Sequence, residues 1–175
     1  MRLPGRWVWL TLGGVAVAGV ALGLVVSGVP WPGSGGRSLP PSRARAYENV
    51  DACLLTGARG LADPTAAQAW AGMEDASRAT TARMSYLAVT GPATEAQAVP
   101  FLGSLLVSGC RVIVASGTAE RAAVLADAPR FPGTRFVVTG PATGPANVTA
   151  LAFTTSGLRA AVAVAVESGV HAAGG

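Results

Sequence analysis

Short apolar runs alternate with helix-like stretches from residue 51 onward. Five runs have the length and the apolar, β-branched content of strands, at residues 52–56, 84–90, 111–115, 135–139 and 148–153. The middle runs are almost continuously apolar, as expected of strands that are covered on both faces. Strands separated by helices in this way are typical of parallel βαβ units.

The helix-like stretches carry start signals. Asp63 followed by Pro64 is typical of an N-cap and a first helical position, and the apolar face that follows consists of Ala66, Ala69, Trp70, Met73 and Ala76. Residues 94–97 match a capping box, and the stripe behind it consists of Val99, Leu102 and Leu106. Pro100 predicts a kink or a later start of this second helix. Residues 118–128 and 155–168 supply two further helices.

This alternation predicts an α/β fold, a three-layer sandwich with one Rossmann-like lobe. Right-handed crossovers lead to a mostly parallel sheet in the order 2-1-3-4-5. We expect the lobe to span residues 47–170, with a tail at 171–175. The motif TGPAT occurs at residues 90–94 and again at 139–143, each time after a predicted strand. Each copy therefore predicts a loop at the carboxyl end of a strand, with ordinary Gly-Pro turn chemistry.

The amino-terminal region differs from the lobe. Residues 7–29 contain no charged side chain and follow Arg2 and Arg6. The run is long enough to span a bilayer, and tryptophans lie at both of its ends. Residues 1–29 are predicted to be an uncleaved membrane anchor or a cleaved signal peptide, and residues 30–46 a Pro/Gly-rich linker. We expect a single-pass protein of the plasma membrane with the lobe on the extracytoplasmic side or, after cleavage, a secreted lobe.

The net charge of +4 belongs to this region rather than to the lobe. All thirteen basic residues are Arg, and five of them precede Tyr47, which leaves eight against nine acidic residues. The lobe contains no basic helix and no Arg stripe interleaved with aromatic residues, so we do not expect nucleic acid as a partner.

Residues for catalysis or metal binding are scarce. The one histidine, His171, falls in the predicted tail, so no Ser-His or Cys-His pair is expected on a rigid frame. One histidine and two distant cysteines do not make a metal site, and the sequence contains neither GxxxxGK[ST] nor GxGxxG. We predict no enzyme activity, no cofactor and no metal.

The two cysteines are more informative. Cys53 and Cys110 lie near the starts of two strands that should be neighbours. In an exported protein this arrangement favours a disulfide. The alternative is a pair of buried thiols within the sheet.

A ligand site is predicted at the carboxyl ends of the strands. In an open parallel sheet, ligands bind where the strand order reverses, which here lies between the first and third strands. The loops at this point contain Thr56, Gly57, Arg59, Ser116, Gly117 and Thr118. Their hydroxyls, backbone N–H groups and helix N-termini suit a small polar or anionic group, although small residues are also what the turns themselves require.

Several stretches together resemble a known family. They are CLLTGARGLADPTAAQAWAGMEDAS, YLAVTGPAT, PFLGSLLVSGCRVIVASG, FPGTRFVVTG and NVTALAFTTSGLRAAVAVAV. From about residue 49 to 166 they resemble the first lobe of the basic membrane protein (PnrA-like) family, solute-binding proteins of ABC importers with the type I periplasmic-binding fold. The resemblance implies a ligand cleft, with nucleosides as the best-known ligands. Where the family's ligand-facing turn lies, this sequence retains Asp63 and Thr65.

Two functions follow from these observations. The first is a membrane-anchored or exported solute-binding domain that takes a small polar, nucleoside-like solute and serves an ABC permease. The alternative is a half-lobe without solute binding that pairs with a second copy of itself or with a separately encoded second lobe.

Overall fold

The described part of the chain, residues 49–152 and 157–174, alternates strands and helices in the computed structural model. Its strands are β1 (Asp51–Thr56), β2 (Arg83–Ala88), β3 (Cys110–Ser116), β4 (Arg135–Thr139) and β5 (Val148–Leu151). Its helices are α1 (Pro64–Thr80), α2 (Glu95–Val107), α3 (Thr118–Asp127) and α4 (Leu158–Gly174), with 3-10 turns at Gly60–Ala62 and Ala128–Arg130.

The sheet has the predicted strand order β2-β1-β3-β4-β5. Every neighbouring pair is parallel, so the sheet is parallel throughout rather than mostly parallel. The register places Leu54 beside Tyr86 on one side and beside Val114 on the other. The predicted fold class is therefore confirmed for the described residues.

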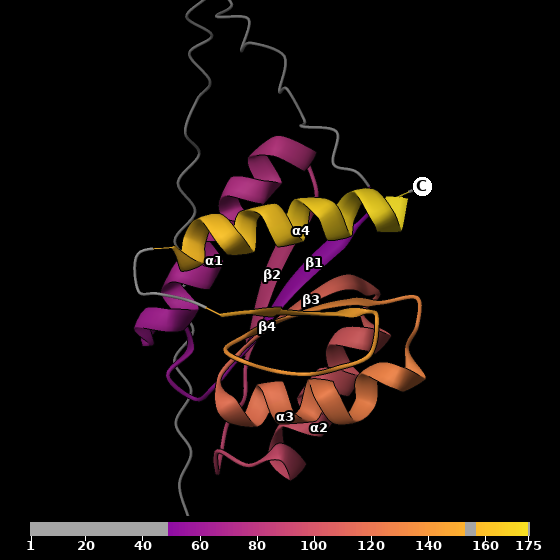
Figure 1. Ribbon diagram of the computed structural model, residues 1–175. Helices are drawn as coiled ribbons and strands as arrows, with labels where there is room; N and C mark the ends of the chain where they lie inside the picture. Colours follow the sequence, from indigo (N-terminus) through magenta and orange to yellow (C-terminus); the bar gives the residue numbers. More distant parts are fainter. Residues whose placement is uncertain (1–48, 153–156, 175) are drawn as a thin grey trace, which may run out of the picture. The chain divides into compact units, whose positions relative to one another are not determined.

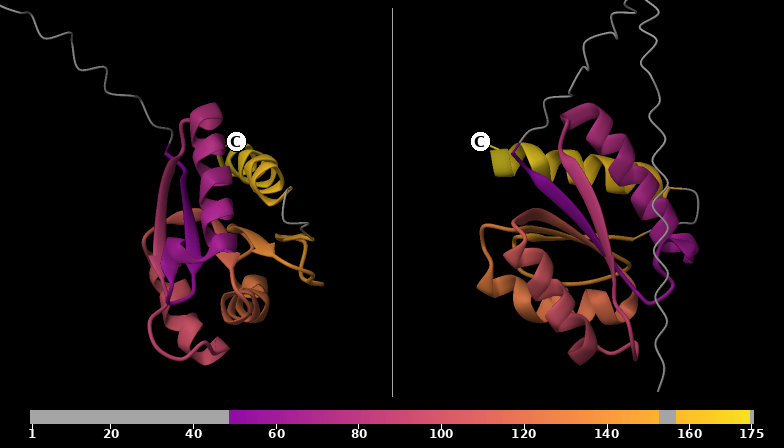
Figure 2. Two further views of the ribbon diagram at one scale, coloured as in Figure 1. Left: turned by 90° about the vertical axis from the view of Figure 1, so that its left-hand side faces the viewer. Right: turned by 180° about the vertical axis from the view of Figure 1, so that it is seen from behind.

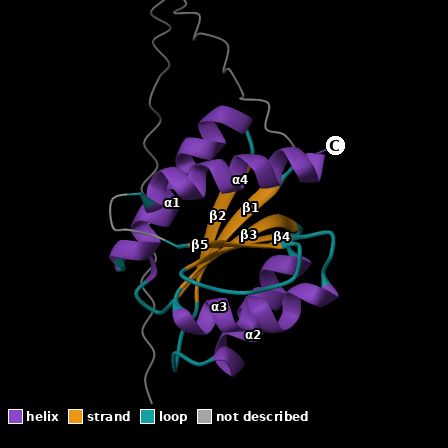
Figure 3. Ribbon diagram, in the orientation of Figure 1, coloured by secondary structure: helices purple, strands orange, loops and turns teal. Residues whose placement is uncertain are grey.

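The two faces of the sheet carry different helices. Figures 1 and 3 show α1 and α4 on one face and α2 and α3 on the other, and the side views of Figure 2 show the same separation. Alternate residues of β1 divide between the two cores: Leu54 packs with α1 and α4, whereas Leu55 packs with α2 and α3. This period of two is the reason why the inner strands read as continuous apolar runs.

The helix N-termini follow the predicted capping only in part. Asp63 caps α1, because its Oδ1 accepts hydrogen bonds from the N–H groups of Thr65 (2.9 Å) and Ala66 (3.3 Å). Thr94 caps α2 in the same way, accepting from the N–H of Gln97. The Gln97 side chain, however, donates to the Thr90 carbonyl (2.7 Å) instead of closing a capping box.

Two helix ends can be compared with their predictions. The sequence predicts a kink or a later start at Pro100, and the later start does not occur, since α2 begins at Glu95 and contains Pro100. The last helix, predicted to end at residue 168, continues to Gly174, so residues 171–174 of the predicted tail, including His171, are helical. The apolar face explains the extension, because Val166 and Val170 are fully buried.

The second strand also differs from its prediction. It ends at Ala88 rather than at residue 90, and the next N–H, that of Val89, donates to the Thr56 carbonyl (2.7 Å) at the end of β1. As an edge strand, β2 has three exposed and three half-buried residues and is not covered on both faces. Tyr86 is 50% exposed and packs edge-to-face against Trp70, with ring centroids 5.5 Å apart.

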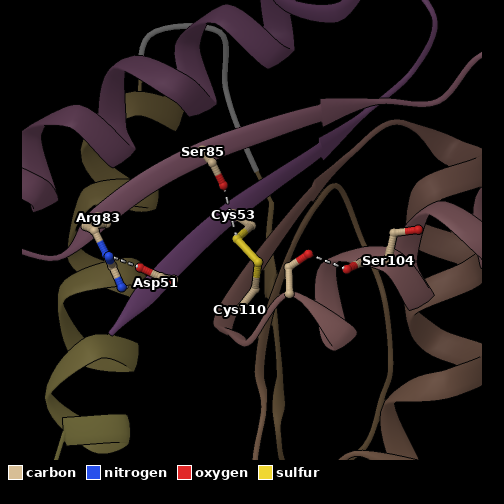
Figure 4. Close-up of a disulfide and its surroundings, with 7 residues drawn as sticks. Asp51, Cys53, Arg83, Ser85, Ser104 and Cys110 are labelled. Carbon is tan, nitrogen blue, oxygen red and sulfur yellow. Dashed lines mark hydrogen bonds and ion pairs between the residues drawn. A yellow bond between two sulfur atoms is a disulfide. The ribbon is translucent and has the colours of Figure 1, made fainter. Parts of the chain in front are cut away.

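The two cysteines form a disulfide (Figure 4), so the alternative of two buried thiols is wrong. Cys53 of β1 and Cys110 of β3 have Cα atoms 5.9 Å apart and are almost completely buried. The Ser85 hydroxyl of β2 donates to the Cys53 sulfur (3.4 Å). The bond therefore joins β1 to β3 toward the amino ends of the strands.

Residues 1–48 lie outside the described part of the chain, and with them the predicted anchor or signal peptide at 1–29 and the linker at 30–46. Among the helices that are described, none combines the length and hydropathy that a membrane crossing requires.

Candidate functional site

A cavity of about 680 Å³ lies at the carboxyl ends of β1, β3 and β4. Thr56, Ser116 and Thr139, the last residues of these strands, all line it. The helix that follows β1 covers one face of the sheet and the helix that follows β3 covers the other, so the cavity lies where the strand order reverses. Its volume is in the usual range for small-molecule sites.

All eight residues predicted to contact a ligand line this one cavity. They are Thr56, Gly57, Arg59, Asp63, Thr65, Ser116, Gly117 and Thr118. The lining also contains residues that sequence reasoning missed, namely Ala58, Ala93, Glu120, Arg121, Thr139, Gly140, Pro141 and Ala152. The structure thus brings the two predicted turns together and adds α3 and the loop after β4.

Two of the predicted residues pair with each other. The Arg59 guanidinium donates to Oδ2 of Asp63, whose Oδ1 caps α1. The hydrogen bond from Arg59, with smaller contributions from the backbone N–H groups of Ala66 and Thr65, holds the pKa of Asp63 below its ordinary value. Both side chains therefore have a structural role in holding the turn and the start of α1.

The β1–α1 turn depends on Gly60. Its N–H donates to the Gly57 carbonyl (2.8 Å), and its φ of 54° lies in the left-handed region that favours glycine. The Thr56 hydroxyl donates to the Gly60 carbonyl (3.4 Å). Thr56 is only 1% exposed, so its side chain has a structural role in holding the turn.

The β3–α3 turn offers a free hydroxyl. Ser116 is buried at the end of β3, and no hydrogen bond of its side chain to another described residue is present. Gly117 is the N-cap of α3, has a φ of 130° and supplies no capping side chain. The Ser116 hydroxyl is therefore not used by another described residue, whereas the Gly117 carbonyl accepts from the N–H of Arg121.

Glu120, the third residue of α3, is the most informative residue that sequence reasoning missed. It is 3% exposed and lines the cavity. Burial raises the pKa of its carboxyl, and the N–H of Glu120 itself, which donates to the carboxyl, opposes that rise. The sequence does contain a signal for this residue. Glu120 is a glutamate among alanines in TAERAA, residues 118–123, three residues after Gly117, the N-cap glycine that follows β3.

Arg121 connects α3 to the end of β4. Its Nη1 donates to the Thr139 carbonyl (3.0 Å), and a Cβ at Gly140 would lie only 2.5 Å from this nitrogen. Gly140 has a φ of 102°, close to the 97° of Gly91 in the first TGPAT copy. The two copies thus share a glycine with positive φ, and both loops leave the carboxyl end of a strand as predicted.

A second cavity of about 730 Å³ lies beside α4 and the strands β4 and β5. Its lining is mostly apolar, includes Val137, Leu151, Val164 and Gly169, and contains none of the predicted ligand residues.

Among the described residues, no group of three or more His, Cys, Asp or Glu side chains could hold a metal ion.

No family model matches this chain, and no curated protein matches it. Solved structures do show a similar fold. A fragment described as a "putative lipoprotein from Peptoclostridium difficile 630" aligns with a TM-score of 0.57 at 11% identity, over 69% of this chain and 98% of that one. A transcriptional activator of the comK gene from Bacillus halodurans aligns with a TM-score of 0.47 at 18% identity, over 57% of this chain and 33% of that one.

Proposed function

We propose that this chain is an exported or membrane-anchored solute-binding domain of the kind that serves ABC importers, and that it binds a small polar, nucleoside-like solute. One observation carries the proposal: the residues that the sequence predicts to contact a ligand line a single cavity of about 680 Å³ at the carboxyl ends of β1 and β3. The resemblance to the basic membrane protein family supports the same function.

Export has separate support. A buried disulfide between β1 and β3 suits an oxidising compartment. The uncharged run at residues 7–29 suits an anchor or signal peptide. The similar fold of a fragment described as a putative lipoprotein is in keeping with both.

We place the chain among binding proteins rather than enzymes. The described lining of the cavity contains hydroxyls, two carboxyls and two guanidinium groups, but neither His nor Cys. With neither His nor Cys in this lining, we assign the Ser116 hydroxyl to hydrogen bonding rather than to nucleophilic attack.

The proposal predicts that small polar solutes stabilise the protein through Ser116. The full-length protein in mild detergent is screened against a panel of nucleosides, sugars and amino acids, and at least one solute should raise its unfolding temperature. A solute at 100 times its Kd raises the free energy of unfolding by about 2.7 kcal/mol. Ser116→Ala removes a hydroxyl without a partner among the described residues. It should weaken binding about fivefold, the effect of one hydrogen bond, with little change in stability.

Ser168→Ala is the matched control, because Ser168 is an exposed serine at the second cavity. It should leave both the stability and the Kd unchanged. The proposal fails when no solute shifts the unfolding temperature, or when Ser116→Ala binds as well as Ser168→Ala. A protein that ignores every solute and sediments as a dimer would favour the half-lobe alternative instead.

A further inference from the structure

The carboxyl of Glu120 accepts from its own N–H but has no charged partner among the described residues. Of the two carboxyls that line the cavity, that of Asp63 pairs with Arg59, whereas no ion pair to Glu120 occurs within the described residues. Glu120 is nevertheless 3% exposed. A buried and unpaired ionisable group destabilises a fold, so packing alone is a poor reason for a glutamate at this position.

The fold leaves space for this carboxyl. A Cβ at Gly57 would lie 3.6 Å from Oε1 of Glu120, and a Cβ at Gly117 would overlap Oε2. The carboxyl is therefore bordered by the glycines of both turns, one after β1 and one after β3. This position is the point where the strand order reverses, and all these residues line the cavity.

The same carboxyl occupies the place that a bound anion would take. A helix N-terminus attracts negative charge through its free N–H groups. At α3, the N-cap Gly117 supplies no side chain, and Glu120 directs its carboxyl back to its own N–H. A phosphate at this helix would meet a carboxylate that is already there.

The two cationic groups of the lining are engaged elsewhere. Arg59 pairs with Asp63, and Arg121 donates to the Thr139 carbonyl. Neither guanidinium forms an ion pair with Glu120 among the described residues, so the carboxylate would repel an anion bound beside it. A hydroxyl, in contrast, can donate to the ionised carboxyl and accept from the protonated one.

We infer, on the basis of the proposed function, that Glu120 determines which solutes this cavity accepts. The cavity takes an uncharged molecule that bears hydroxyl groups, one of which hydrogen-bonds to the Glu120 carboxyl. Phosphorylated and other anionic solutes are excluded by the same carboxyl.

Calorimetric titration of the full-length protein in mild detergent tests this inference. The probes are adenosine, uridine, D-ribose and D-glucose as uncharged solutes, and inorganic phosphate as the anion. The wild type should bind at least one uncharged probe and no phosphate. Glu120→Gln should weaken the uncharged probe at least tenfold and strengthen phosphate at least tenfold, because a charge-assisted hydrogen bond is lost and the repulsion is removed.

Glu95→Gln is the matched control, since Glu95 is an exposed acidic residue in the first turn of α2. It should change neither titration. Two outcomes would overturn the inference while the proposed function stands. In the first, an uncharged probe binds and Glu120→Gln leaves its Kd unchanged. In the second, the wild type binds phosphate as tightly as it binds the uncharged probe. If no uncharged probe binds the wild type, the proposed function fails and the inference fails with it.

Thermal unfolding tests the premise that Glu120 is buried without a charged partner that stabilises it. Burial raises the folded-state pKa of Glu120, so the stability that this group contributes is lost as the pH rises through that pKa. Glu120→Gln should therefore unfold at a higher temperature than the wild type at pH 7, and the difference should shrink below about pH 4. The other charged groups of the lining, Arg59, Asp63 and Arg121, are unchanged in this comparison. A lower unfolding temperature at pH 7 would indicate a structural glutamate and overturn the inference.

Discussion

Replacing Cys53 and Cys110 together by alanine is expected to lower the free energy of unfolding by about 4 kcal/mol, the value that chain entropy assigns to a cross-link of this span. The two cysteines are 57 residues apart in the sequence, and their disulfide joins β1 to β3. Without it, the unfolded chain gains the freedom that the closed loop removes. Denaturant titration of the full-length protein in mild detergent measures the difference.

Reduction of the wild type provides the control for this prediction. Dithiothreitol should shift the wild-type midpoint toward that of the double variant and should leave the double variant unchanged. Equal midpoints for oxidised wild type, reduced wild type and double variant would contradict the stabilising role of the bond. The cavity lies at the opposite ends of the strands, so solute binding by the folded double variant should be retained.

Gly72→Ala should destabilise the protein by about 2 kcal/mol, in the range measured for atoms forced into a well-packed core. Gly72 lies where α1 meets α4, and a Cβ there would overlap the Arg159 carbonyl oxygen and lie 3.0 Å from the Cβ of Val162. A backbone oxygen can give way only if the helix moves. Such a movement would also disturb the ion pair between Arg159 and Asp75, which joins the same two helices.

Gly103→Ala is the matched control for this substitution. Gly103 also lies inside a helix, α2, but an added Cβ would meet no atom within 4 Å. Alanine has the higher helix propensity, so this variant should be more stable than the wild type by about 1 kcal/mol. Thermal or denaturant unfolding compares the two variants, and equal effects of both substitutions would contradict the close approach of α1 and α4.

The strands and the first helix start could be predicted because their signals are local. The apolar runs, the Asp63-Pro64 pair and the glycines after β1 and β3 each determine the conformation of a few neighbouring residues, and a parallel alternation leaves few topologies. The sheet order and the meeting of the two turns at one cavity follow from that. Prediction of the disulfide required one further inference, namely that β1 and β3 are neighbours in the sheet.

The features that could not be predicted depend on contacts between distant segments. Glu120 lies beside Gly57, a residue more than sixty positions earlier in the chain. The exposure of β2 comes from its place at the sheet edge. Likewise, Val170 is buried because α4 packs across the sheet, which periodicity in a short, Ala-rich segment does not reveal.

The roles of individual ligand candidates also changed with the structure. Arg59 and Asp63 lie in the cavity as predicted, but they pair with each other. Ser116 and Glu120 instead have side chains that no other described residue engages. The chemistry of the candidate site is therefore concentrated at the β3–α3 turn rather than at the β1–α1 turn.

Amide chemical-shift mapping is the most direct test of solute binding at this cavity. Full-length ¹⁵N-labelled protein in mild detergent would be titrated with adenosine, uridine and D-ribose to millimolar concentration. We predict that the shifts concentrate at Gly57, Gly117 and Gly140, which line the cavity, while Gly103 and the second-cavity residue Gly169 stay unchanged. An absence of shifts with every solute, or shifts confined to Gly169 and its neighbours on α4, would contradict the account.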